Sequence, residues 1–178
     1  MSIIVPGNEV ALSPFATVTI GGGLFSTDSF LQALHDADCV YSYEVEGILR
    51  NFSFHPSAAE VCVPVYIITA FDLGYKRPPM FKNMVQKAVS LGFKPCTTEI
   101  ALLTRLTYSH PSQREEITVV MPSEYPRTDV GDSGAPMSGA RRLILSLEGS
   151  LSSKCLHAVT EHQPHYRCSL REKWLFAA

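Results

Sequence analysis

The sequence predicts an α+β fold in which a largely antiparallel sheet carries three to four helices on one face. Segments typical of strands and helices follow one another as strand, two helices, strand, helix and then mostly strands. Hydrophobic residues make up 46% of the 178 positions and charged residues 18%, a composition typical of globular proteins. No linker or internal repeat is visible, so we expect one globular domain over residues 1–178.

The first helices and strands of the chain are predicted from runs of β-branched residues and from helix-capping residues. Residues 16–20 (ATVTI) predict a strand, and the three glycines at 21–23 predict a turn. A glycine-rich turn before a helix can hold phosphate, but this one lacks the Walker lysine and the dinucleotide glycine spacing, which favours a plain turn. Ser26 caps an expected helix, and residues 43–50 predict a second one. We expect a helical hairpin joined tightly through Asp38 and Cys39.

The best-specified element is a helix that begins near residue 81, after an apolar strand over residues 61–68. Pro78 and Pro79 suit a first helical turn, where a backbone N–H has no partner within the helix. Gly92 suits a left-handed C-cap. The apolar stripe recurs at i, i+3, i+4 and i+7 and consists of Phe81, Met84, Val85 and Ala88.

The second half is expected to consist mainly of strands. After a short helical turn capped by Thr97 or Thr98, residues 105–108 predict the start of a strand that pairs with residues 117–121 as a hairpin. Residues 122–140 are rich in Pro, Ser, Gly and Asp and predict an irregular loop. Further strands are expected over residues 143–147 and 166–176.

Several short motifs occur in a fixed order along the chain: Leu73-Gly74-Tyr75, Leu91-Gly92, Cys96, Glu99 and Arg105-Leu106-Thr107-Tyr108. This pattern resembles a group of small, uncharacterised bacterial proteins, some of which are labelled "helicase". The resemblance implies a shared fold and no particular mechanism. No Walker A motif GxxxxGK[ST] is present, so the helicase label finds no support.

Charge and cysteine content indicate a soluble cytoplasmic protein. The formal charge of -2 gives no strong signal for nucleic acid or for an anionic membrane surface. The longest apolar run, residues 61–71, contains Pro64 and is about half a membrane span. An odd number of widely spaced cysteines, with no signal-peptide pattern at the N-terminus, indicates reduced thiols.

The string Gly-Asp-Ser-Gly-Ala-Pro at residues 131–136 resembles the nucleophile loop of chymotrypsin-like serine proteases, with Ser133 as the candidate nucleophile. A protease of that kind also needs an upstream histidine after a strand. His35 falls in an expected helix, and His55 is the only other early candidate. The expected series of about a dozen short strands is missing as well, so we do not expect this chemistry.

A second candidate functional site is a cluster of possible metal ligands, cysteines and histidines, near the C-terminal end of the sequence. Zinc binds four nitrogen or sulfur ligands in a tetrahedron, and this cluster offers five within fourteen positions. The spacing matches no standard zinc module, and a structural zinc is the only cofactor that the sequence suggests. The ligands are Cys155, His157, His162, His165 and Cys168.

A third candidate is Cys96, since a thiol at a helix start can become nucleophilic. No histidine base is placed beside it, so we expect a buried thiol, with Glu99 and Arg105 forming an ion pair.

Two functions remain open. The first is a small binding or regulatory protein that occupies a protein partner, as immunity proteins, antitoxins and phage inhibitors do. The second is a hydrolase or metal-dependent enzyme using Ser133 or the Cys/His cluster. For the first, we expect contacts from Tyr125, Arg127 and Met137 in the loop, because such residue types are enriched in interfaces. The charged face of the helix near residue 81 is expected to be ordinary exterior.

Overall fold

A computed structural model of the chain describes residues 3–4, 11–51, 54–108, 115–122, 128–130, 136–141, 143–149, 154–160 and 166–178. The helices in these ranges are α1 (Thr27–Asp36), α2 (Tyr43–Asn51), α3 (Phe81–Ser90) and α4 (Thr98–Thr107). The strands are β1 (Ile3–Ile4), β2 (Ala11–Leu12), β3 (Ala16–Ile20), β4 (Cys39–Tyr41), β5 (Val61–Ile68), β6 (Glu116–Val119), β7 (Thr128–Val130), β8 (Pro136–Arg141), β9 (Leu143–Gly149), β10 (Lys154–Thr160) and β11 (Lys173–Ala177).

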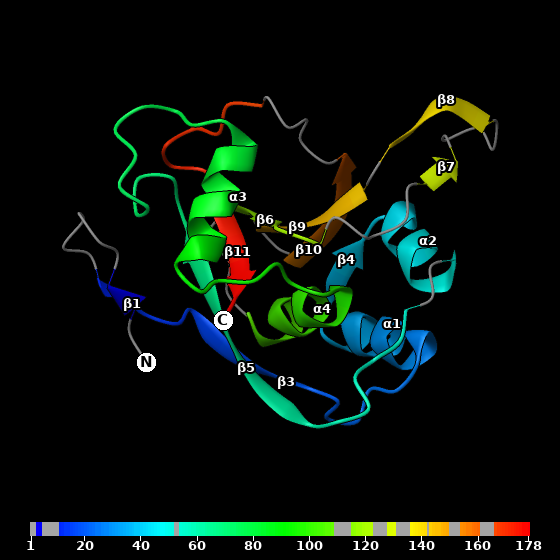
Figure 1. Cartoon of the computed structure of the whole chain (residues 1–178). Coiled ribbons are helices and arrows are strands. Elements are labelled where there is room, and N and C mark those ends of the chain that lie inside the picture. Colours follow the sequence, from blue (N-terminus) through cyan, green and yellow to red (C-terminus); the bar gives the residue numbers. More distant parts are fainter. Residues whose placement is uncertain are drawn as a thin grey trace.

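Seven of these strands form one curled sheet in the order β3-β5-β11-β6-β9-β10-β4 (Figure 1). Four of its six ladders are antiparallel, whereas β11 with β6 and β10 with β4 are parallel. The predicted α+β class is therefore confirmed, with a mixed sheet. β7 and β8 pair with each other, so the range 122–140, predicted to be irregular, contains a two-stranded ladder.

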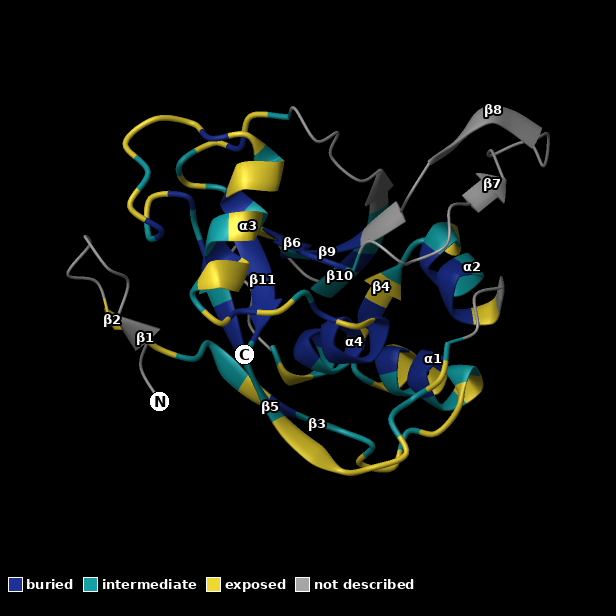
Figure 2. Cartoon of the chain, viewed as in Figure 1, coloured by how far each residue is buried: buried dark blue, intermediate teal, exposed yellow. Residues whose placement is uncertain are grey.

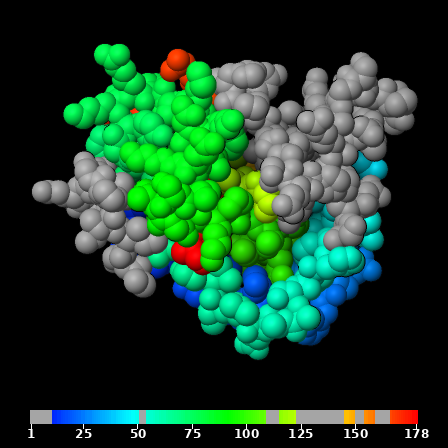
Figure 3. Space-filling model, viewed as in Figure 1, coloured from blue at the N-terminus to red at the C-terminus, as the bar shows by residue number. Residues whose placement is uncertain are grey.

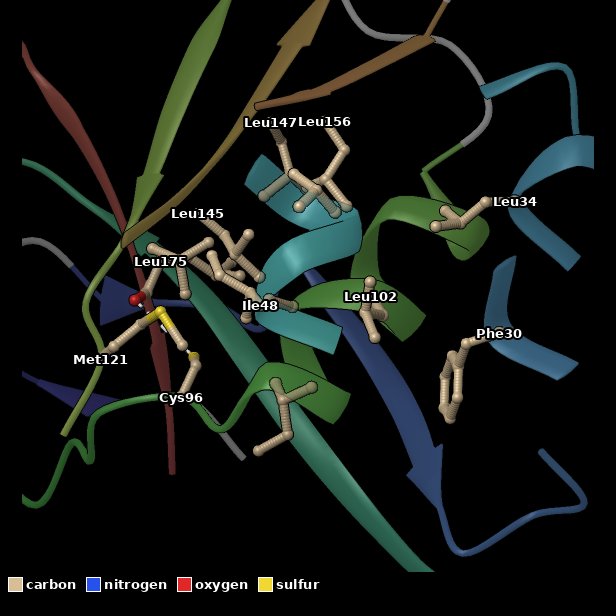
Figure 4. Packing of buried hydrophobic residues seen from close by; sticks show 14 of the residues in the cluster. Phe30, Leu34, Ile48, Cys96, Leu102, Met121, Leu145, Leu147, Leu156 and Leu175 are labelled. Atoms are coloured by element: carbon tan, nitrogen blue, oxygen red, sulfur yellow. Dashed lines mark hydrogen bonds between the residues drawn. The ribbon is translucent and has the colours of Figure 1, made fainter. Parts of the chain in front are cut away.

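Three helices cover one face of the sheet. The apolar sides of α1, α2 and α4 meet leucines from β9, β10 and β11 in one buried cluster (Figure 4). Phe30 and Leu34 of α1 and Leu102 of α4 have no exposed surface. Burying a side chain of this size stabilises the fold by about 1.5–3 kcal/mol, so this cluster holds the three helices on the sheet.

α3 covers the opposite face. Trp174 and Phe176 of β11 point away from the first cluster, because side chains alternate along a strand, and they pack against Met84 and Ala88 of α3. The predicted apolar stripe is confirmed, with exposed residues along the outer side of the helix (Figure 2). The chain leaves the helix through Gly92, which has the predicted left-handed conformation with φ +96°. The two prolines precede the helix instead of opening it.

The predicted strand at residues 105–108 is wrong, because residues 105–107 form the end of α4 and Tyr108 is its C-cap. Threonines disfavour helices, but here their hydroxyls donate to carbonyl oxygens one turn back, from Thr104 to Ile100 (2.7 Å) and from Thr107 to Leu103 (2.8 Å). Thr97 caps the helix by accepting a hydrogen bond from the backbone N–H of Ile100. The expected hairpin with residues 117–121 is therefore wrong too.

The connection between α1 and α2 also differs from the tight hairpin that was predicted. Asp38 adopts a left-handed conformation with φ 52°, which ends the helical course. The chain then forms β4, an edge strand that pairs in parallel with β10. Cys39 is consequently a sheet residue whose side chain is buried in the first cluster. None of the helices in the described ranges is long and apolar enough to cross a bilayer.

Candidate functional site: a basic surface around α3

Two of the predicted zinc ligands share one face of β10. Cys155 and His157 flank the buried Leu156, so both side chains lie on the opposite face, as the sequence predicted for an extended segment. Nε2 of His157 lies 3.4 Å from Oε2 of Glu148 on the neighbouring strand. This contact gives the imidazole a carboxylate partner.

The third described ligand lies elsewhere. Cys168 is buried in the cluster beneath α3, and its backbone N–H donates to the carbonyl of Pro79 (2.9 Å). Burial raises the pKa of its thiol to about 12. His162 and His165 lie outside the described residues. Among the residues that are described, no three His, Cys, Asp or Glu side chains come together as a metal site.

The residues predicted to contact a partner, and the candidate protease serine, have side chains that lie outside the description of the structure. Tyr125, Arg127 and Ser133 fall outside the described ranges. Met137 lies in β8, and its side chain is outside the description as well. His35 is on the surface, with its side chain 80% exposed.

Cys96 has the buried position that the sequence favoured. It has no exposed surface, and its thiol donates to the carbonyl of Leu175 at 3.7 Å (Figure 4). Burial raises the pKa of this thiol far above its ordinary value. A thiol that remains protonated and covered is a packing residue rather than a nucleophile.

The predicted ion pair between Glu99 and Arg105 is wrong, because each group has other partners. Glu99 accepts hydrogen bonds from the backbone N–H groups of Gly21 (2.9 Å) and Ser57 (2.8 Å). Arg105 donates to the backbone carbonyls of Glu148 and Tyr108. The glycine turn thus already holds a carboxylate where a phosphate would bind, which supports the plain turn expected there.

A surface next to α3 is built from two segments that are far apart in the sequence. Residues 69–80 run beside residues 166–172 and are joined to them by backbone hydrogen bonds from Phe71 to Leu170 (3.1 Å) and from Cys168 to Pro79 (2.9 Å). The Arg167 guanidinium donates to the carbonyl of Pro78 (3.1 Å). Figure 3 shows the green segment that contains α3 as a continuous outer surface, with the orange-red segment near residue 170 beside it.

This surface gathers positive charge. Residues 72–90 and 166–172 contain six Lys or Arg and two acidic residues, in a chain whose formal charge is -2. Within the described part of the chain, none of the six cationic groups on these two segments pairs with a carboxylate. We call these six the basic surface: Lys76, Arg77, Lys82, Lys87, Arg167 and Arg171.

The two acids of these segments are occupied locally. Asp72 accepts from the backbone N–H of Thr69 (2.8 Å) and from its hydroxyl (2.7 Å). Glu172 accepts from the hydroxyl of Tyr166 (2.5 Å) and from the backbone N–H of Ser169 (2.6 Å). The hydrogen bond to Glu172 raises the pKa of Tyr166 to about 12. The carboxylates therefore shape the two loops and do not pair with the cations.

Exposed apolar side chains lie among the cations. Phe71 is 59% exposed and Met80 is 41% exposed. Nζ of Lys87 lies 4.8 Å from the centroid of the Tyr75 ring, a cation–π contact. The Tyr75 hydroxyl donates to the carbonyl of Asn83 (3.1 Å), which fixes the ring against α3.

Charge of the opposite sign lies around α1 and α2. Residues 26–60 contain six acidic residues and one basic residue, Arg50. Arg50 is paired with Asp28 (3.1 Å) and Glu46 (2.7 Å). The molecule is therefore polarised, with a basic side at α3 and an acidic side at α1 and α2. Sequence reasoning missed this because it used the net charge of the whole chain; counting charge by segment would have revealed it.

No family model matches the chain, and no curated protein or solved structure matches it either. The resemblance to small bacterial proteins stays a prediction.

Proposed function

We propose that this chain is a non-catalytic binding protein that acts by occupying a macromolecular partner, and that the basic surface is its contact face. The observation that carries the proposal is a group of six cationic side chains without carboxylate partners in the described part of the chain. Cations that lie on one side of a molecule without carboxylate partners attract anions. The partner therefore presents negative charge.

The loops that carry the surface support this role. Backbone hydrogen bonds at Phe71, Phe81 and Cys168 tie residues 69–81 to residues 166–170. Loops tied in this way lose little backbone conformational entropy when a partner binds. The five widely spaced cysteines suit a reducing compartment, so we propose that the protein acts in the cytoplasm.

The test uses immobilised heparin, a sulfated polyanion, and a matched pair of variants. Lys82 and Lys94 are both exposed lysines, one in the first turn of α3 and one beyond its C-terminal end. We expect Lys82→Glu to elute at a lower salt concentration than the native protein, and Lys94→Glu to elute with it. A glutamate in the first turn suits the helix dipole, so Lys82→Glu leaves α3 intact.

Both variants change the net charge equally, so the comparison separates a local surface from overall charge. Failure of the native protein to bind heparin, or an equal loss in both variants, contradicts the proposal.

A further inference from the structure

Resting on the proposed function, we infer that the partner of the basic surface is a single-stranded nucleic acid. The composition of the surface suits the phosphates of this partner. Three of its six cations are lysines, which are depleted in protein–protein interfaces. The other three are arginines, whose planar guanidinium groups bind phosphate oxygens in pairs. Such a mixture suits a row of phosphates.

The exposed aromatic ring favours a single strand over a duplex. Phe71 lies next to Leu170 through a backbone hydrogen bond of 3.1 Å, which brings it beside the segment that carries Arg167 and Arg171. Its 59% exposure leaves ring surface accessible to a base. Unpaired bases stack on aromatic side chains whatever their sequence, whereas the bases of a duplex are already stacked on each other.

The separation of the basic and acidic sides limits the length of nucleic-acid strand that can contact the protein. The acidic side at α1 and α2 repels phosphates, so the strand is confined to the α3 side. α3 has 10 residues and is about 15 Å long, which suits a short segment of a strand rather than a wrapped one. Six cations predict that the logarithm of the binding constant falls with the logarithm of salt concentration with a slope of about -4.

Fluorescence anisotropy tests the inference with a labelled oligothymidylate of about 12 nucleotides, a length within the usual range of single-strand sites. The same measurement is made with a duplex of equal length and with polyglutamate, an acidic peptide. We expect the native protein to bind the single strand most tightly, with affinity falling as salt rises from about 50 mM to about 200 mM. Lys82→Glu should weaken this binding and reduce the salt dependence, whereas Lys94→Glu should change neither.

Phe71 provides the variant that separates stacking from charge. Phe71→Ala should weaken binding to the single strand about tenfold and leave heparin elution unchanged, because the loss of stacking removes no charge. Phe71→Trp should retain binding, and melting temperatures of both variants verify folding.

Two results overturn the inference while leaving the proposed function standing. One is heparin binding that depends on Lys82 without preferential binding of the single strand over duplex and polyglutamate. The other is undiminished single-strand binding by Phe71→Ala. Loss of heparin binding itself overturns both.

Discussion

At the scale of single residues, Glu99 shows how one buried carboxylate can organise distant segments. It is 5% exposed and lies at the start of α4, yet its two oxygens accept hydrogen bonds from Gly21 and Ser57. The end of β3, the loop before β5 and α4 therefore meet at one side chain. Space is so limited there that a Cβ added at Gly21 would lie 2.3 Å from the carbonyl oxygen of Ala59.

The first prediction concerns this carboxylate. Glu99→Gln keeps the shape but replaces one acceptor oxygen with an NH2 group, which faces a backbone N–H and cannot accept from it. We expect the free energy of unfolding to fall by about 1.5–3 kcal/mol, the value of a hydrogen bond to a charged group. Urea denaturation measures the change.

Glu60→Gln is the control. Glu60 is exposed, so its neutralisation should change stability by no more than about 0.5 kcal/mol. Equal effects of the two substitutions would show that Glu99 does not join these segments.

At the scale of elements, α3 illustrates how burial gives the two sides of one helix different roles. Its inner side contributes Met84 and Ala88 to the cluster around Trp174, and both are fully buried. Its outer side carries Lys82 and part of the basic surface. The helix is therefore held by apolar packing, and its cations can change without loss of the fold.

A pair of truncations in α3 tests this orientation. Met84→Ala leaves a cavity beneath the helix, and we expect it to reduce the free energy of unfolding by about 2–5 kcal/mol. Val89→Ala, at a position that is 48% exposed, should change it by about 0.5 kcal/mol or less. Both are measured by urea denaturation, and a large loss from Val89→Ala would mean that α3 is rotated about its axis.

At the scale of the whole molecule, burial raises the pKa of cysteine thiols on both faces of the sheet above the value that they have in the unfolded chain. Burial raises the pKa of Cys39 from 9.0 to about 11 and that of Cys168 from 9.0 to about 12. Cys39 belongs to the cluster at α1, α2 and α4, and Cys168 to the cluster at α3. A buried thiol with a raised pKa thus lies on each face of the sheet.

The pH dependence follows from these directions. Below pH 9.0 the two thiols are protonated in the folded and unfolded states alike, so their burial adds no pH dependence. As pH rises through that value, the unfolded chain loses the protons first, which favours unfolding. We expect the free energy of unfolding to be level at neutral pH and to fall from pH 9.0 until the folded thiols titrate at about 11 to about 12.

Urea denaturation across this pH range measures the decline. The double variant Cys39→Ala, Cys168→Ala should show a shallower decline, because it lacks both thiols. An unchanged decline in the double variant would assign the alkaline sensitivity to other groups.

Much of the fold could be predicted from local patterns. The periodic stripe and Gly92 predicted α3, a β-branched run predicted β3 and a nearly continuous apolar run predicted β5, because these signals depend on neighbours a few residues away. The beginning of α4 was predicted as a short helical turn, but its last turn was mistaken for the start of a strand, because residues 105–108 include a threonine and a tyrosine, which have high strand propensity. The threonine hydroxyls of α4 satisfy helix carbonyls, and the buried side of the helix supplies the stabilisation that propensity lacks.

Local sequence by itself determined most of the helices and strands of the described chain, and it determined that Cys155 and His157 share one face of a strand. The strand predicted over residues 166–176 is confined to β11, and β4 was not predicted. Tertiary structure alone decided that Cys168 lies apart from them and that Glu99 and Arg105 do not pair. It also decided that residues 69–80 meet residues 166–172 and gather the basic surface. The physical reason is that burial and long-range hydrogen bonds act between residues brought close only by the folded chain, whereas propensity and periodicity act between neighbours in sequence.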